Sequence, residues 1–147
     1  MSNIRELKEK IAKGCRFLYM DGLMDHSGHI SARVSGTDRV LINPFSVSRA
    51  AVMADDIATV DLEGRLLEGQ HEPPAETAIH TCIYRVRSDV VSVAHFHPYF
   101  ATLFAIAGKP LVPVSSHGAI FGKAVPVYMD PDHVTDKERG ESLARSL

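Results

Sequence analysis

The sequence has no tryptophan, only two cysteines and no long apolar run. Cys15 and Cys82 lie far apart on segments with helical patterns, and one pair gives no disulfide framework, so we expect buried free thiols. No apolar stretch approaches the ~20 residues that cross a bilayer. Residues 1–6 carry charged side chains and lack the apolar core of a signal peptide. We therefore expect a cytoplasmic protein without a membrane segment.

Neither sign of charge predominates in the sequence. The 16 basic and 18 acidic residues give a formal net charge of −2 and form no block of one sign, which argues against nucleic acid as a partner. With 147 residues, of which 45% are apolar and 23% charged, the chain is long enough for one compact core. No internal repeat or linker divides it, so we predict a single domain over residues 1–147.

The first half of the chain predicts one helix followed by antiparallel strands. Apolar residues recur at steps of three and four from Ile4 to Leu18, which predicts an amphipathic helix that ends near Gly22. Four short β-like runs follow, and polar turns that contain glycine separate them in pairs. The predicted strands are 28–34, 39–43, 57–61 and 65–68.

The second half predicts helices on both sides of one strand. Helical spacing covers 75–87 and 99–107, and the apolar run 90–95 lies between them. Two further runs that carry prolines indicate edge strands or connectors, and a charged, helix-prone segment ends the chain. These three segments are 112–114, 124–128 and 136–147. Nothing follows this last helix to complete the sheet, so we expect a domain truncated at its C-terminus.

Histidine is abundant, with eight residues, and the most informative pair is His95 and His97. Residues two apart on a β-strand project from the same face, so both imidazoles can share a metal ion. Two imidazoles alone bind a divalent ion weakly, and a third ligand is needed. His117 is the candidate within the chain, and His71 and His80 are weaker ones.

Glu76 is the candidate catalytic residue. It stands at the start of the predicted helix that leads into the histidine strand, and a carboxylate beside a two-histidine site is suited to metal-assisted proton transfer. The helix dipole alone also favours an acidic residue there. At the entrance of an earlier strand, Gly28 is followed by the polar side chains of His29 and Ser31, which suits substrate binding.

Four segments of this chain occur in the order seen in the class II aldolase/adducin family, which it resembles from the first helix to about Tyr128. They are 28–31, 41–44, 74–76 and 94–98. The resemblance implies an α/β fold with three α/β/α layers around a mainly antiparallel sheet, and a ring-like homotetramer with active sites at subunit interfaces. It also implies His95 and His97 as metal ligands and Glu76 as the acid/base residue. The family's third metal histidine follows the last helix, beyond Leu147.

Three places in the sequence depart from the family pattern, and they concern the substrate. Family members that cleave sugar phosphates hold the phosphate with a Ser-Ser pair and a Thr-Gly pair, where this chain has Pro74-Ala75 and Phe45-Ser46. His29 replaces an asparagine, and this variant resembles the family's branch of metal-dependent decarboxylases. A protonated His29 would pair with a carboxylate, and a neutral His29 packed at the strand entrance is the alternative.

These features together predict a metal-dependent carbon–carbon lyase, which we interpret as a decarboxylase of a small hydroxylated aromatic or hydroxy-carboxylate substrate. The alternatives are an aldolase that cleaves a sugar or sugar phosphate, and a non-catalytic, adducin-like assembly module. Nitrogen ligands favour Zn²⁺, with Mn²⁺ or Fe²⁺ as alternatives. The residues assigned to substrate binding are Gly28, His29, Ser31, Asn43 and His117.

Overall fold

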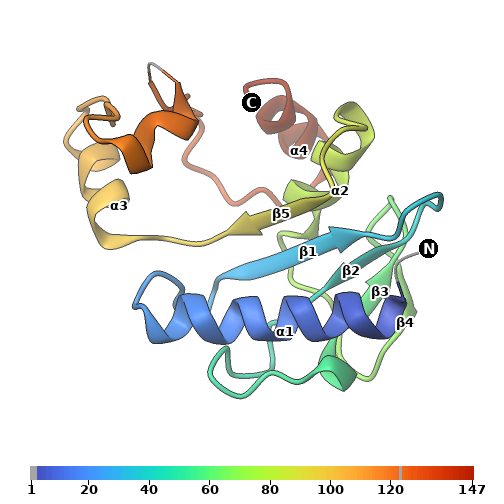
Figure 1. Ribbon diagram of the computed structural model, residues 1–147. Coiled ribbons are helices and arrows are strands. Elements are labelled where there is room, and N and C mark those ends of the chain that lie inside the picture. Colours follow the sequence, from blue (N-terminus) through green and yellow to red (C-terminus); the bar gives the residue numbers. More distant parts are fainter. Residues whose placement is uncertain (1–2, 123) are drawn as a thin grey trace.

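The computed structural model describes residues 3–122 and 124–147. Figure 1 shows a five-stranded antiparallel sheet with helices on both faces, in the strand order β4-β3-β2-β1-β5. The strands are β1 (His29–Arg33), β2 (Val40–Ile42), β3 (Ala58–Val60), β4 (Leu66–Glu68) and β5 (Ser92–His95). The helices are α1 (Ile4–Met20), α2 (Thr77–Val86), α3 (Tyr99–Ile106) and α4 (Lys137–Ala144), with short 3-10 helices η1 (Ala54–Asp56) and η2 (Ser116–Phe121). The predicted three-layer arrangement is confirmed.

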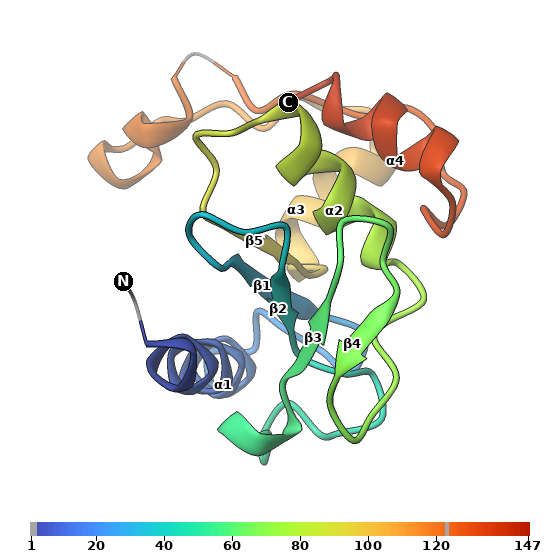
Figure 2. The same ribbon diagram turned by 90° about the vertical axis from the view of Figure 1, so that its right-hand side faces the viewer.

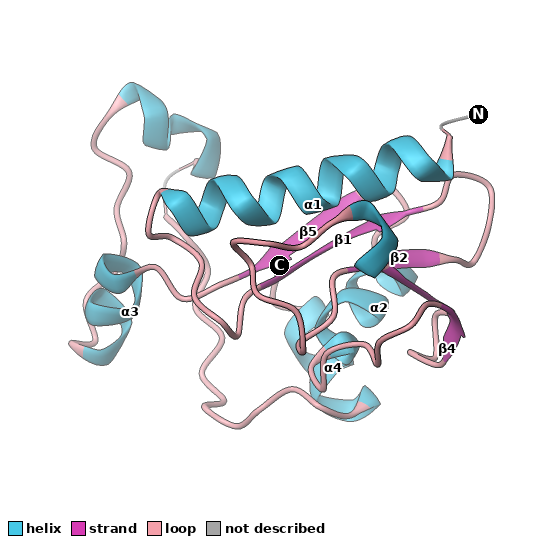
Figure 3. Cartoon of the chain, turned by 90° about the horizontal axis from the view of Figure 1, so that it is seen from below, coloured by secondary structure: helices cyan, strands magenta, loops and turns pink. Residues whose placement is uncertain are grey.

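Side-chain alternation along β2 explains the two buried faces of the sheet. Leu41 packs with Ile11 of α1, whereas Val40 and Ile42 pack on the opposite face with Tyr84 of α2. The three strand residues are all buried, so the strand is a continuous apolar run. Figure 2 shows α1 on one face of the sheet and α2 with α4 on the other, and Figure 3 shows α1 lying across the strands.

The first helix, α1, forms where the apolar periodicity predicted it. Asn3 caps it by accepting a hydrogen bond from Arg5 N at 3.0 Å, and Ile11 and Cys15 lie on its buried face. Cys15 and Cys82 are buried free thiols, as predicted, and burial raises the pKa of Cys15 to about 11. Within the described residues, no helix combines the length and the apolar character needed to cross a bilayer.

The runs 112–114 and 124–128, which the sequence predicts as edge strands or connectors, are connectors, because both are irregular backbone. Each contains a proline, which lacks the N–H that a strand ladder needs. The two regions approach each other through a backbone hydrogen bond from Val125 N to Leu111 O at 3.4 Å, without forming a ladder. α3 has no buried residue, and Figure 1 shows α3 and η2 standing away from the sheet. This part of the chain therefore packs little against the core.

The helices α2 and α4 approach each other closely at Gly140. A Cβ atom at this position would lie 2.8 Å from the carbonyl oxygen of Ala78 and 2.7 Å from Cys82 Sγ. Such separations are shorter than non-bonded contacts allow, and one of them involves rigid backbone. The contact between the two helices therefore requires glycine here.

We expect Gly140→Ala to lower the free energy of unfolding, because overpacking typically costs about 1–3 kcal/mol. This loss should outweigh the gain in helix propensity, which is at most about 1 kcal/mol. Urea unfolding measures the change, and Glu138→Ala, an exposed position on α4, is the control with a change within about 0.5 kcal/mol. An unchanged or more stable Gly140→Ala protein would contradict the close approach of α2 and α4.

Candidate metal centre and active site

The candidate site lies where β1 pairs with β5. The antiparallel register sets His29 opposite His95, which brings both side chains to the same face of the sheet. Their rings stack with centroids 4.8 Å apart and an angle of 22° between the planes. The ring of His97, just beyond β5, meets the His95 ring edge-on, also with centroids 4.8 Å apart. Strand pairing thus gathers three imidazoles, and the one from β1 was expected to bind substrate.

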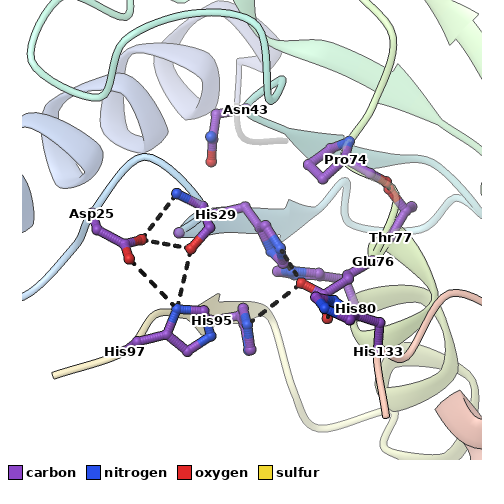
Figure 4. Close-up of polar contacts among 12 residues, drawn as sticks. Asp25, His29, Asn43, Pro74, Glu76, Thr77, His80, His95, His97 and His133 are labelled. Atoms are coloured by element: carbon purple, nitrogen blue, oxygen red, sulfur yellow. Dashed lines mark hydrogen bonds and ion pairs between the residues drawn. The ribbon is translucent and has the colours of Figure 1, made fainter.

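Glu76 reaches this cluster from the layer above the sheet. It is the N-cap residue of α2, but its side chain makes no capping hydrogen bond. Its Oε2 atom lies 3.7 Å from His29 Nε2 and 3.7 Å from His95 Nε2 (Figure 4). Its Oε1 atom lies 3.5 Å from Nδ1 of His133. The start of α2 therefore holds a carboxylate against the imidazoles.

The donor atoms of this cluster fit a divalent metal ion. The Nε2 atoms of His29 and His95 are buried and have no hydrogen-bond partner among the described residues. One ligand atom each from His29, Glu76 and His95 lie within 4.8 Å of one another. Imidazole nitrogens with a carboxylate oxygen form a usual donor set for Zn²⁺. A bound ion would satisfy both orphaned nitrogens.

Asp25 and Ser27 fix the protonation of His97. The Ser27 hydroxyl donates to Asp25 Oδ1 at 2.6 Å, since an ionised carboxylate only accepts, and this hydrogen bond lowers the pKa of Asp25. The same hydroxyl oxygen lies 3.1 Å from His97 Nδ1, so the imidazole donates to it. Nε2 of His97 then keeps its lone pair, as a metal ligand requires. Sequence analysis missed both residues, whose signal is an Asp-x-Ser turn before β1.

Starting at His29, four buried side chains form a continuous hydrogen-bonded chain. His29 Nδ1 lies 2.6 Å from His80 Nε2. Ser31 Oγ lies 2.6 Å from His80 Nδ1 and 2.8 Å from the Tyr84 hydroxyl. All four side chains are at most 1% exposed. The chain links β1 to α2 and gives these buried polar groups partners.

Burial keeps His29 and His80 neutral. It lowers the pKa of His29 to about 3, with the nearby His95 adding to the effect, and it lowers the pKa of His80 well below its ordinary value. The contact between His29 and Glu76 is therefore not an ion pair at neutral pH. The option of a protonated His29 that pairs with a carboxylate is wrong, because the strand entrance is desolvated.

Two cavities meet at Glu76. The larger, of about 430 Å³, has residues 45–46 and 74–75 in its wall together with His29. The smaller, of about 270 Å³, is lined by His95 and His97. No lysine or arginine occurs among the described residues that line either cavity. The positions that depart from the family pattern thus face the same space as the carboxylate.

His133 is the residue in the site for which sequence analysis had no signal. It lines both cavities, and its side chain is 86% exposed. It lies on irregular backbone between η2 and α4, outside any motif. Only the folded arrangement brings it to Glu76.

The remaining residues assigned to substrate binding line neither cavity. Gly28 packs closely on β5, where a Cβ atom would lie 3.3 Å from the carbonyl oxygen of His95. The buried Asn43 accepts a hydrogen bond from the backbone of β1 at 2.6 Å, and Ser31 belongs to the buried chain. His117 is exposed on η2, and Figure 1 shows this segment away from the sheet. Their role in binding stays a prediction, and the structure does not bring His117 to the imidazoles.

Comparison with known proteins identifies the family. Residues 9–147 match the Class II Aldolase and Adducin N-terminal domain. The chain therefore belongs to the class II aldolase/adducin family, as its motifs indicated. It is 29% identical over 119 residues to an L-fuculose phosphate aldolase of Methanocaldococcus jannaschii, a match that covers 80% of this chain and 64% of that protein.

Solved structures share the fold. An aldolase II superfamily protein from Pseudomonas syringae has a TM-score of 0.84 and 25% identity, over 99% of this chain and 60% of that one. An L-fuculose-1-phosphate aldolase from Thermus thermophilus has a TM-score of 0.74 and 26% identity, over 97% of this chain and 70% of that one. This chain thus spans between 60% and 70% of the length of these three relatives.

We expect the metal-free protein to lose stability as the pH falls below about 6.5. His29 and His80 stay neutral when folded, but bind protons at their ordinary pKa when unfolded. Because the folded pKa is the lower one for both, their contribution is full above the unfolded pKa and is lost as the pH falls, for His29 toward about pH 3. Each histidine that is protonated only in the unfolded state lowers the free energy of unfolding by about 1.4 kcal/mol per pH unit. Urea unfolding with a chelator measures this, and constant stability from about pH 7 to about pH 5 would contradict it.

Proposed function

We propose that this protein is a metal-dependent carbon–carbon lyase of the aldolase type. One observation carries the proposal: buried imidazole nitrogens without partners among the described residues face the carboxylate of Glu76. A non-catalytic assembly module has no need of this arrangement, since unsatisfied buried polar atoms reduce stability. Family membership supports a lyase, and the names of two relatives as fuculose phosphate aldolases support the aldolase type over the decarboxylase that we first predicted.

In this proposal His95 and His97 hold a divalent ion. The proton on Nδ1 of His97 supports this role, because it leaves Nε2 free to bind. Zn²⁺ is favoured because most of the donors are nitrogen, and Mn²⁺ and Fe²⁺ are the alternatives. When bound, the ion supplies Lewis-acid chemistry to a substrate oxygen next to the bond that breaks.

Glu76 moves the proton in this proposal. Its carboxylate borders both cavities and is 17% exposed, so it reaches a substrate while remaining partly desolvated. As a base it takes the proton from a substrate hydroxyl, and the electrons of the O–H bond form the new carbonyl as the carbon–carbon bond breaks. As an acid it returns the proton to the carbon that keeps the electron pair.

We expect Glu76→Gln to lower kcat by about 10²–10⁴-fold, because the amide keeps the size of the side chain and cannot exchange the proton. Assays at saturating Zn²⁺, with metal content checked by elemental analysis, separate this loss from weaker ion binding. Glu138→Gln, an exposed change on α4, should keep wild-type turnover. Wild-type turnover in metal-loaded Glu76→Gln would remove Glu76 from the proposed mechanism.

The substrate has two candidates, each favoured by a different observation. The names of the relatives support retro-aldol cleavage of a sugar phosphate, which is our first proposal. The wall of the larger cavity supports decarboxylation of a hydroxylated aromatic or hydroxy-carboxylate substrate. Pro74 has no N–H there, and neither Pro74 nor Ala75 has a hydroxyl to hold a phosphate.

A substrate panel assayed with the metal-loaded protein separates the two reactions. We expect aldehyde release from a ketose 1-phosphate and no CO₂ release from aromatic hydroxy-dicarboxylates. The double variant Pro74→Ser with Ala75→Ser should lower KM for the phosphate by about tenfold, as one added hydrogen bond to a charged group allows. Release of CO₂ without aldehyde release would favour the second candidate instead.

We also propose that copies of the chain associate, as the tetramer that the family resemblance implies. α3 exposes the apolar side chains of Tyr99, Phe100 and Ile106, each more than 70% exposed. A group of exposed apolar side chains on one helix is typical of an interaction surface. This supports association, and size-exclusion chromatography with light scattering measures the number of copies.

A further inference from the structure

His29 stands out because one of its two ring nitrogens is buried without a partner among the described residues. The side chain is 1% exposed, and its Nδ1 atom pairs with His80. Its Nε2 atom is the one that lacks a hydrogen-bond partner within 3–122 and 124–147, and it faces Glu76. Buried polar atoms normally have a partner, so a buried nitrogen without one that faces a site indicates a bound ligand.

We propose that His29 is itself a metal ligand, which binds through Nε2 and joins His95, His97 and Glu76 in holding the ion. The inference rests on the proposed function, because it adds a ligand to the same metal site. It differs from the sequence analysis, which placed His29 in substrate binding, expected the family's third ligand beyond Leu147 and named His117 as the candidate within the chain.

The distances support equal roles for His29 and His95. Nε2 of each imidazole lies 3.7 Å from the same oxygen, Glu76 Oε2. The three ligand atoms of His29, His95 and Glu76 already lie within 4.8 Å of one another. The two residues face each other across the β1–β5 ladder, and both side chains are held by regular backbone. Both nitrogens thus face the same carboxylate oxygen.

The buried chain behind His29 sets the tautomer that a ligand needs. A lone pair on Nε2 requires the proton on Nδ1, which then donates to His80 Nε2 at 2.6 Å. His80 in turn donates from Nδ1 to Ser31, and the Ser31 hydroxyl donates to the oxygen of Tyr84. Each group carries one proton for this chain, so all of the hydrogen bonds run in one direction. His80 is therefore a positioning residue, in the place where metal-bound histidines commonly have a hydrogen-bond acceptor.

The alternative role for His29 is a hydrogen-bond donor to substrate, because its side chain also lines the larger cavity. In that role the chain runs in the opposite direction, and Nε2 carries the proton. The two roles make different predictions without substrate. A ligand changes the affinity of the protein for metal, and a donor to substrate does not.

Titration of the chelator-treated protein with Zn²⁺ tests the proposal by calorimetry. We expect His29→Ala and His29→Asn to lower Zn²⁺ affinity by more than the ~10–100-fold that loss of an outer partner costs. Asparagine is too short to reach the ion, but it keeps a polar group for His80, so this variant tests metal binding without removing the partner of a buried side chain. His95→Ala is the positive control for a ligand, and His71→Ala, outside the cluster, is the matched control that should bind like the wild type.

Nitrogen-15 NMR of the histidine rings gives a second readout on the same samples. We expect Zn²⁺ to shift the Nε2 resonance of His29 and to leave the proton on Nδ1. If the His29 variants fold by circular dichroism and bind Zn²⁺ like the wild type, while His95→Ala does not, only the proposed role of His29 is overturned. A wild-type protein that binds no Zn²⁺ would overturn the proposed function together with this inference.

Discussion

The pairing of β1 with β5 is the constraint on which the site depends. Side chains alternate between the faces of a strand, so a slip of one residue would turn His29 or His95 into the opposite layer. The register is supported at the strand entrance, where Gly28 allows the backbone of β1 to approach that of β5. The buried Arg49 secures the same point by donating to the carbonyl oxygens of Gly28 and Pro44. Contacts outside the site thus decide where its imidazoles point.

The layer between β1 and α2 contains buried polar side chains where an apolar core would be simpler. Ser31, His80 and Tyr84 avoid the cost of burial because they hydrogen-bond to one another, and the imidazoles avoid the larger cost of burying charge by staying neutral. Such a network has a use when it orients a functional group. Here its last member is His29, whose remaining nitrogen faces Glu76.

Periodicity predicted the regular elements well, because apolar residues of the two layers repeat at the spacing of a helix or a strand. It left 112–114 and 124–128 open between edge strands and connectors, and the β-like residues there lie on backbone that makes no ladder. Motifs indicated Glu76 and the pair His95 and His97, and the two histidines, which are neighbours in sequence, also meet in the site. The Asp-x-Ser turn marks Asp25 and Ser27, but no sequence pattern indicated their contact with His97 or the approach of His133, because these depend on how distant loops fold together. The direction of the His29 ring was equally hidden, since it depends on pairing with a strand far along the chain.

The neutral imidazoles also bear on the charge of the substrate. No lysine or arginine occurs among the described residues that line the two cavities, and burial holds His29 in its neutral form. Neutral histidines and one carboxylate would leave a divalent ion in the proposed site with net positive charge. A phosphate or a carboxylate of a substrate would then be attracted to the ion more than to any side chain of these walls. Anion recognition and activation of the substrate would therefore share one centre, so a change in the donor set would alter substrate binding and turnover together.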